Sequence, residues 1–176
     1  FLPLLKRKGY LPMLDRNTIV QFEQDLLQKK QLNQSIDREA NYIISVTEDT
    51  LINAQENQFV NLISTANIPV EHIYFKVQDE WLTDQGILRQ LQLLKERGFK
   101  IALDLNKLEL SLNDASQYGM VDLIKLGNSL VRTLMPSDQT RVLMKEFVNW
   151  ITDLSIVVVM EGLTVNEHLD HIKCLD

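Results

Sequence analysis

The sequence predicts an α/β protein built around parallel strands. Short apolar segments rich in Val and Ile alternate with segments whose apolar residues recur every three to four positions. The short segments are apolar throughout, which is typical of parallel strands covered by helices on both faces. A length of 176 residues, with 45% hydrophobic and 24% charged residues, suits a single globular domain spanning 1–176.

The first half of the chain contains two predicted strands and three predicted helices. Ile19, Phe22 and Leu26 lie on one face of a helix that follows Asp15 and ends near Asn33. Another apolar stripe, over 59–66, predicts a helix that stops before Pro69. The third helix covers 87–94 and ends at Gly98, a residue suited to a left-handed C-cap. The strands are 42–46 and 72–77.

The second half continues the same alternation. Three further strands are predicted, at 101–105, 121–126 and 155–160. A polar helical turn is expected at 113–117, and the last helix begins at Thr164. Between them, the longest predicted apolar stripe comprises Leu143, Phe147, Trp150, Ile151 and Leu154.

Two architectures fit this alternation, an open doubly wound sheet and a (β/α) barrel. Both place ligand sites at the carboxyl ends of the strands. No Gly-x-Gly-x-x-Gly follows a strand, and the chain has only six glycines, which excludes a dinucleotide oxidoreductase of the usual kind.

Charge and cysteine content restrict the partners and the compartment. With 18 Lys and Arg against 24 Asp and Glu, the net charge is −6, which argues against direct nucleic-acid binding and against an anionic membrane surface. The single Cys174 forms no internal disulfide, and a reducing, cytoplasmic location is expected. The chain opens on Phe1 without an initiator Met, and we expect it to be a fragment.

Polar residues close each predicted strand. They are Ser45, Lys76, Asp104, Lys125 and Glu161. In parallel strands these side chains converge at one edge, where the carboxylates of Asp104 and Glu161 could hold a divalent cation beside Lys125. A salt-bridge network without chemistry is the alternative explanation.

Three of these strands resemble those of EAL-domain cyclic-di-GMP phosphodiesterases. The segments are Ile101-Ala102-Leu103-Asp104, 121–126 and 158–163, and the spacing from Asp104 to Lys125 fits the family without a gap. Phe1-Leu2-Pro3-Leu4 and 11–16 resemble the helix entrance that follows the family's signature strand. The resemblance covers the whole chain. It implies a TIM-like (β/α) barrel represented by about five central units, without the Glu-Ala-Leu strand and the closing strand.

The resemblance also identifies departures from the active pattern. Asp104, Lys125 and Glu161 are kept. Elsewhere the implied ligands are replaced: Ser45 stands for an Asn, Lys76 for a Glu, Leu105 for the second Asp of Asp-Asp-Phe-Gly, Gly127 for the Asp of Lys-Ile-Asp, Thr164 for a Glu and His168 for a Gln. The flexible Gly-rich loop of the family is replaced by 108–112, which has no glycine.

Several of these residues have structural explanations. Lys76 is expected to pair with Asp104 or Glu161, and Thr164 with Glu167 forms a Thr-x-x-Glu capping box. His168 and His171 are expected on a solvated helix face.

These observations predict a catalytically inactive, regulatory EAL-like domain that binds a protein partner in bacterial signalling. Degenerate family members either bind cyclic-di-GMP without cutting it or bind only proteins, so a non-hydrolysing cyclic-di-GMP sensor is the alternative and an active phosphodiesterase a third. No cofactor is expected, since Mg²⁺ or Mn²⁺ would be needed only by an active enzyme. The segment is expected to make no membrane contact, and a dimer is one arrangement it could adopt.

Overall fold

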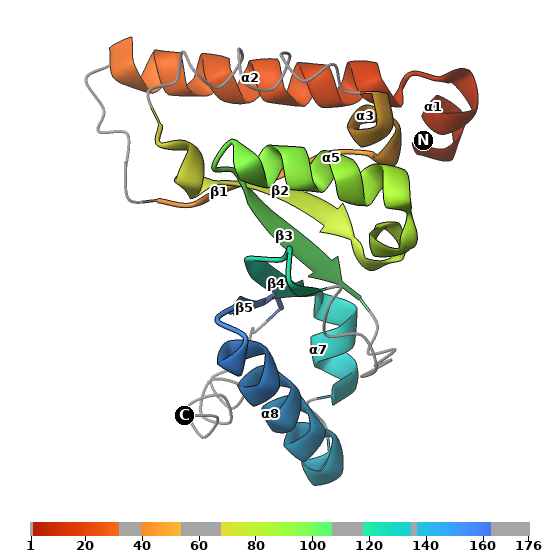
Figure 1. The fold of residues 1–176 in the computed structure, drawn as a ribbon, viewed down its shortest axis with the longest axis vertical. Coiled ribbons are helices and arrows are strands. Elements are labelled where there is room, and N and C mark those ends of the chain that lie inside the picture. The colour runs from red at the N-terminus through yellow and green to blue at the C-terminus, as the bar shows by residue number, and fades with distance from the viewer. Residues whose placement is uncertain (1, 32–39, 54–67, 107–117, 135–136, 163–176) are drawn as a thin grey trace. The chain divides into compact units, whose positions relative to one another are not determined.

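The computed structural model describes residues 2–31, 40–53, 68–106, 118–134 and 137–162. Five strands form one sheet in the order β1-β2-β3-β4-β5 (Figure 1). The pairings of β1 with β2, β3 with β4 and β4 with β5 are all parallel. Strand order that follows chain order is the order of a (β/α) barrel, whereas a doubly wound sheet reverses it. The α/β prediction is confirmed, and the sheet is of the barrel type.

The chain divides into two compact units, residues 1–101 and 102–176. The elements of the N-terminal unit, in chain order, are α1 (Leu2–Lys8), α2 (Leu11–Gln31), β1 (Tyr42–Ser45), α3 (Glu48–Asn53), η1 (Val70–His72), β2 (Ile73–Gln78), η2 (Asp79–Thr83) and α5 (Gln85–Glu96). Those of the C-terminal unit are β4 (Leu123–Leu126), α7 (Asn128–Leu134), α8 (Asp138–Asp153) and β5 (Val157–Met160). The division falls within β3 (Lys100–Leu105).

The core of the N-terminal unit lies between its strands and helices. Helix α3 contacts both α2 and α5, and β1 pairs with β2 from Tyr42↔Ile73 to Ser45↔Lys76. Phe75 of β2 is fully buried against Phe99, with ring centroids 5.3 Å apart. The strand pairing and this apolar contact fix the positions of β1, which ends at Ser45, and of β2, which contains Lys76.

Helix α2 begins earlier than the sequence predicts. It starts at Leu11, and Pro12 occupies its first turn, where a missing N–H costs nothing. Asp15, predicted to precede the helix, lies inside it and is only 4% exposed. Its carboxylate accepts two hydrogen bonds from Thr47, which follows β1, at 2.6 Å from the backbone N and 2.7 Å from Oγ1. Asp15 is thus a buried acceptor inside the helix, and the prediction that it precedes the helix was wrong.

Helix α5 agrees closely with its prediction. Its N-cap is Asp84, whose carboxylate accepts from the N–H groups of Gly86 and Ile87. At the other end Gly98 has a φ of +89°, and its N–H donates to the carbonyl of Lys95. The predicted left-handed glycine at the helix end is confirmed.

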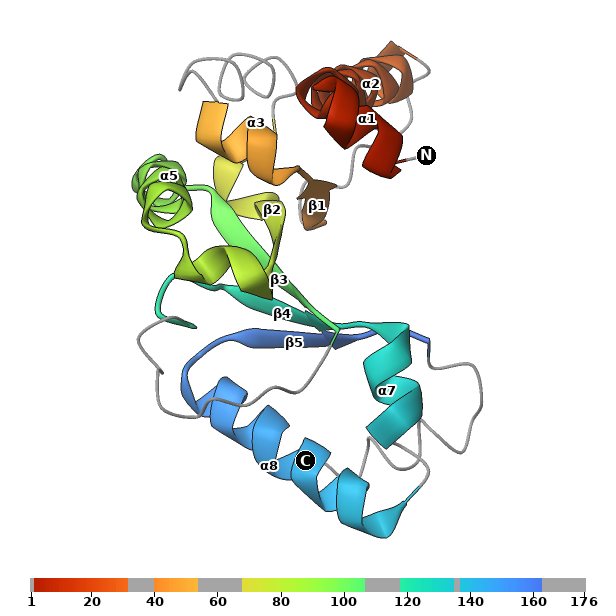
Figure 2. The same ribbon diagram turned by 90° about the vertical axis from the view of Figure 1, so that its right-hand side faces the viewer.

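In the C-terminal unit, α7 and α8 lie on the same side of β4 and β5 (Figures 1 and 2). Helix α8 begins after Ser137, whose hydroxyl accepts from the N–H of Thr140. Its buried face consists of Met144, Phe147 and Ile151.

The predicted apolar stripe of α8 is partly wrong. Leu143 and Leu154 are 60% and 41% exposed, although Phe147 and Ile151 are buried as predicted. Leu143 lies about 100° around the helix from buried Met144, which places it at the margin of the packed face. Leu154 lies beyond the last residue of the helix, which is Asp153.

Some elements were not predicted, and some predictions fall outside the described residues. Helices α1, α3 and α7 were not predicted, since each has only six or seven residues. The predicted helix at 59–66, the turn at 113–117 and the helix from Thr164 lie outside the described ranges. Within those ranges, no helix combines the length and apolarity needed to span a bilayer.

Candidate functional site

Three charged residues meet at the carboxyl ends of the C-terminal strands. Asp104 lies in β3 opposite Lys125 in β4, and Lys125 lies opposite Val159 in β5. Glu161 directly follows β5, and its N–H donates to the carbonyl of Leu126 at 3.0 Å, which extends the strand pairing by one residue. We call Asp104, Lys125 and Glu161 the strand-end site.

Lys125 connects both carboxylates of the strand-end site. Its Nζ lies 3.5 Å from Asp104 Oδ1 and 3.0 Å from Glu161 Oε1. The side chains of Lys125 and Asp104 are 13% and 11% exposed, whereas that of Glu161 is 49% exposed. The ammonium is therefore partly buried between two acids, and the predicted convergence of these three residues is confirmed.

The electrostatics of Lys125 follow from this geometry. Burial alone lowers the pKa of Lys125, because it removes water from the ammonium. The hydrogen bond to Glu161 and the negative charges of Asp104 and Glu161 act in the opposite direction and outweigh burial. The pKa of Lys125 is raised above its usual value, so this side chain is a fixed cation at neutral pH and cannot act there as a general base.

Leu105 gives the site an apolar neighbour where the resemblance implies a second acid. It follows Asp104 in β3 and is 5% exposed. Because successive side chains of a strand point to opposite faces, Leu105 points away from the face of Asp104. It contributes to the core and supplies no ligand.

A glycine stands where the resemblance implies a further carboxylate. Gly127 follows β4, and its N–H donates to the carbonyl of Leu105 at 2.9 Å. A Cβ built on Gly127 would collide with Oδ1 of Asn106 and lie 3.2 Å from its Cγ. The Asn106 side chain therefore occupies the space that a side chain at position 127 would need.

The same arrangement recurs one strand further along. Gly162 follows Glu161 with a φ of +79°, and a Cβ there would lie 2.6 Å from Cγ of Asn128. Each of these two glycines thus lies against an asparagine that follows the preceding strand. The sequence analysis did not identify Asn106 and Asn128. A pattern was present, since in each case an Asn follows one strand and a Gly follows the next strand.

The other predicted site residues that the structure describes, Ser45 and Lys76, belong to the N-terminal unit. Ser45 is the last residue of β1 and lies opposite Lys76, which is inside β2; Ser45 is exposed and Lys76 is half-buried. The pairing of Lys76 with Asp104 or Glu161 stays a prediction. His168 lies outside the described residues.

The described residues do not fit the two-metal cage implied by the resemblance. No group of three or more His, Cys, Asp or Glu in the described ranges is placed to hold a metal ion. Two carboxylates remain at the strand-end site, and both pair with Lys125. Two-metal phosphodiester hydrolysis needs ligands for both cations around a shared water, and Leu105 and Gly127 supply none.

The parallel strand order and the polar residues at the strand ends define a domain of the (β/α) barrel class. The chain belongs to the EAL domain family, whose sequence profile matches residues 1–175. No curated protein sequence matches the chain.

Solved EAL structures share the fold. The EAL enzyme Bd1971 with cAMP and cyclic-di-GMP bound has a TM-score of 0.79 and 12% identity, with 99% of this chain and 48% of that chain covered. The PaMucR phosphodiesterase with cyclic-di-GMP has a TM-score of 0.75 and 14% identity, with 99% and 71% covered. The FimX EAL domain of Xanthomonas citri with cyclic-di-GMP has a TM-score of 0.82 and 9% identity, with 99% and 69% covered. The chain thus spans about half the length of the first of these and about 70% of the other two.

Proposed function

We propose that this chain is a catalytically inactive EAL domain that acts as a regulatory, protein-binding module in cytoplasmic signalling. The observation that carries the proposal is the state of the strand-end site. Its two carboxylates, Asp104 and Glu161, share one ammonium, Lys125, while Leu105 and Gly127 replace two further acids.

Ligand count supports the loss of activity. A pair of divalent cations brings four positive charges and needs many oxygen ligands. Asp104, Lys125 and Glu161 together carry a charge of −1, which is too little to offset that charge. Position 76 holds a lysine where the family resemblance implies a Glu, so it supplies no carboxylate ligand for a cation.

The space at the site supports the same conclusion. Restoring an acid at position 127 would require Asn106 to move, because the Asn106 side chain fills that space. The loss of the acid is therefore accompanied by a second residue that packs against the glycine. The strands that form the site are kept, whereas the acidic ligands needed for catalysis are replaced. This combination favours a binding role over a catalytic one.

A non-hydrolysing cyclic-di-GMP sensor is the second candidate. It is favoured by retention of Lys125 and by the exposed carboxamides of Asn106 and Asn128 beside the strand-end site, which can donate and accept hydrogen bonds. Related EAL structures such as that of FimX hold cyclic-di-GMP. On this alternative, the nucleotide binds without a metal.

Calorimetric titration of the full chain with cyclic-di-GMP, with and without Mg²⁺ or Mn²⁺, separates the candidates. Products are then analysed by chromatography on the same samples, with the PaMucR phosphodiesterase as the positive control. We expect no binding at high micromolar nucleotide and no linear product. Binding without cleavage would replace the proposal with the sensor, and metal-dependent cleavage would overturn the proposed inactivity.

A further inference from the structure

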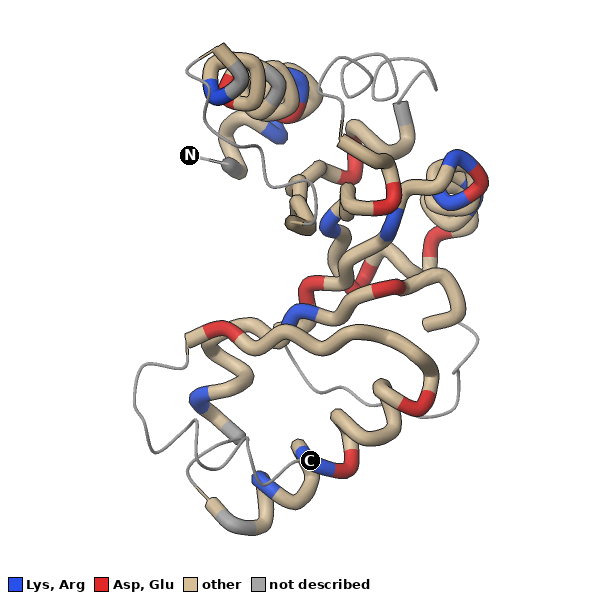
Figure 3. Tube along the Cα trace, turned by 90° about the vertical axis from the view of Figure 1, so that its left-hand side faces the viewer, with Lys and Arg blue, Asp and Glu red and all other residues tan. Residues whose placement is uncertain are grey.

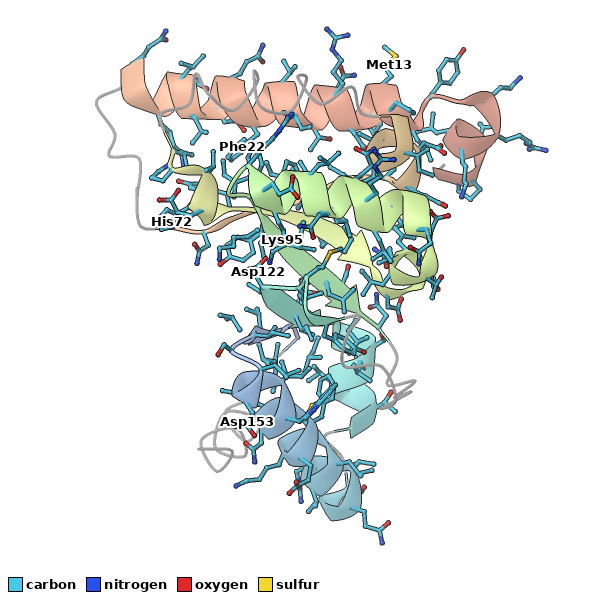
Figure 4. All side chains as sticks on the ribbon, in the orientation of Figure 1. Met13, Phe22, His72, Lys95, Asp122 and Asp153 are labelled. Atoms are coloured by element: carbon cyan, nitrogen blue, oxygen red, sulfur yellow. The ribbon has the colours of Figure 1, made fainter. Side chains whose placement is uncertain are left out.

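The N-terminal helices expose apolar side chains close together in sequence. Leu4 in α1 is 50% exposed, Tyr10 between α1 and α2 is 55% exposed, and Met13 in the first turn of α2 is 62% exposed. In Figure 4 the Met13 side chain extends from the outer side of α2, whereas Phe22 extends from the opposite side. Helices α1 and α2 contact each other, so these side chains belong to one corner of the N-terminal unit.

The same corner is basic in an otherwise acidic chain. Residues 2–16 contain four cations, Lys6, Arg7, Lys8 and Arg16, and one acid, Asp15. Asp15 is buried and accepts hydrogen bonds from Thr47, so it adds little negative charge to the surface. Figure 3 shows the basic run of α1 as a blue segment near the N-terminus.

Three of these cations are available to a partner. Lys6 Nζ lies 3.6 Å from Glu48 Oε2, in an exposed ion pair that is worth little. Arg7, Lys8 and Arg16 are exposed, and in the part of the chain that the structure describes none of them forms an ion pair with a carboxylate. Residues 2–16 carry a net charge of +3 against −6 for the whole chain.

We propose that this corner, defined by Leu4, Arg7, Lys8, Tyr10, Met13 and Arg16, is the docking surface for an acidic segment of a protein partner. Charge complementarity selects an acidic partner, because the corner is positive while the rest of the chain is negative. Tyr, Met and Arg are enriched at the centres of protein interfaces, and Met adapts its shape to a partner's side chains. The partner would supply Asp or Glu to the cations and an apolar anchor to Tyr10 and Met13.

A membrane surface fits the corner less well. Surface-binding helices present a continuous apolar face along their length. Helix α1 has only seven residues, and α2 turns the row Leu11, Ile19 and Leu26 inward, where all three are buried. Isolated apolar side chains among cations favour a protein segment over lipid.

This inference rests on the proposed protein-binding role, and it is tested with a defined probe. The full chain is titrated against a fluorescent synthetic peptide of alternating Glu and Leu residues, against the same peptide with Lys for Glu, and against vesicles containing anionic phospholipid. We expect the acidic peptide to bind in the micromolar range and the basic peptide not to bind. Affinity for the acidic peptide should fall as salt is raised from about 50 to 300 mM, because exposed charges are screened.

Variants locate the binding. Arg7→Glu with Arg16→Glu should weaken binding of the acidic peptide at least tenfold, and Met13→Ala should weaken it several-fold. The matched control is Arg89→Glu with Arg132→Glu, which reverses two exposed cations on α5 and α7 and should leave binding unchanged. Circular dichroism confirms that each variant is folded.

The other outcomes overturn the docking surface. Equal loss in the control pair would mean that net charge, and not the corner, governs binding. Binding to the vesicles alone would assign the corner to lipid, and no binding to any probe would remove it as an acidic-segment site. Failure of the proposed inactivity is seen separately, as linear product in the cyclic-di-GMP assay.

Discussion

Lys125 is the residue on which the strand-end site depends. It lies within 4 Å of both Asp104 and Glu161, but the two acids differ in burial, with Asp104 at 11% and Glu161 at 49% side-chain exposure. Removing a charge from a partly buried pair costs far more than removing it from an exposed pair. We therefore expect the ion pair between Lys125 and Asp104 to contribute more to stability than the ion pair between Lys125 and Glu161.

Replacing Lys125 tests this asymmetry. Lys125→Met should lower the free energy of unfolding by about 2 kcal/mol, because the mostly buried Asp104 loses Lys125 as its ion-pair partner. Glu161→Gln should cost less than about 1 kcal/mol, since that pair is half exposed. Urea unfolding at pH 7 measures both, and equal losses would contradict the assigned burial.

The raised pKa of Lys125 gives this effect a pH dependence. A cation whose folded-state pKa exceeds its unfolded value, about 10.4, contributes its full stability below pH 10.4 and loses it as the pH rises through the folded-state pKa. The stability difference between the wild type and Lys125→Met should therefore be constant from pH 7 to 9 and shrink above about pH 10.5. Unfolding midpoints across this range provide the measurement, and a difference that grew above pH 10.5 would show that the sign is wrong.

Asn106 and Gly127 make a second residue-scale prediction. Gly127→Ala should lower the free energy of unfolding by about 1 kcal/mol, because the new Cβ meets the Asn106 side chain. The φ of Gly127 is not positive, so no backbone strain adds to this cost. In an Asn106→Ala background the same change should cost nothing, giving a coupling of about 1 kcal/mol in a double-mutant cycle. Additive effects would mean that the two residues do not pack together.

At the scale of secondary-structure elements, two features stabilise the helices. One is the turn that ends α8, and the other is a buried carboxylate that links α2 to the start of α3. Helix α8 ends in a left-handed turn in which Ser155 has a φ of +62° and the N–H of Ile156 donates to the carbonyl of Ile151. Only glycine adopts this conformation without a steric cost. Helix α2 is joined to the start of α3 through Asp15 and Thr47.

Ser155→Gly should stabilise the chain. The change removes the left-handed strain, and we expect a gain of about 0.5 to 1 kcal/mol, seen as a higher midpoint in thermal unfolding. Asn149→Gly, at an exposed position inside α8, is the matched control and should instead destabilise by about 0.5 kcal/mol, since glycine is unfavourable in a helix interior. The same sign for both would refute the strain at position 155.

Asp15→Ala should break the link between α2 and α3. Thr47 would lose the acceptor for its backbone N–H and its hydroxyl, at an expected cost of about 2 kcal/mol in urea unfolding. Asp25→Ala removes an exposed acid on the same helix, which accepts a hydrogen bond from the Gln21 side chain, and should cost less than about 0.5 kcal/mol. A small effect at Asp15 would show that the link is not what holds these helices together.

At the scale of the whole molecule, the lack of a cation cage among the residues that the structure describes predicts how the protein responds to metal. A ligand that binds only the folded state stabilises it, by about 2.7 kcal/mol at one hundred times its dissociation constant. Because both strand-end carboxylates pair with Lys125, we expect the unfolding temperature to be the same in 5 mM Mg²⁺, 5 mM Mn²⁺ and EDTA. A rise with either metal would show that the site holds cations after all.

The sequence by itself determined the alternation of strands and helices, the family and the C-terminal end of α5. These depend on local composition, on spacing and on a helix-ending glycine such as Gly98, which act within a few residues. It also indicated that Asp104, Lys125 and Glu161 would meet, because parallel strands end at one edge.

Only the tertiary structure decided which of these groups bind one another. The two ion pairs of Lys125, the filling of the space at Gly127 by Asn106, and the burial of Asp15 against Thr47 join residues 21 to 36 positions apart, and that distance in sequence has no local signal. Likewise, the packed face of α8 includes Met144 and not Leu143, because the orientation of the helix against its neighbours determines which side chains are buried. Strand register and helix packing bring distant side chains within a few ångströms, and they depend on the fit of the whole core rather than on the propensity of any one segment.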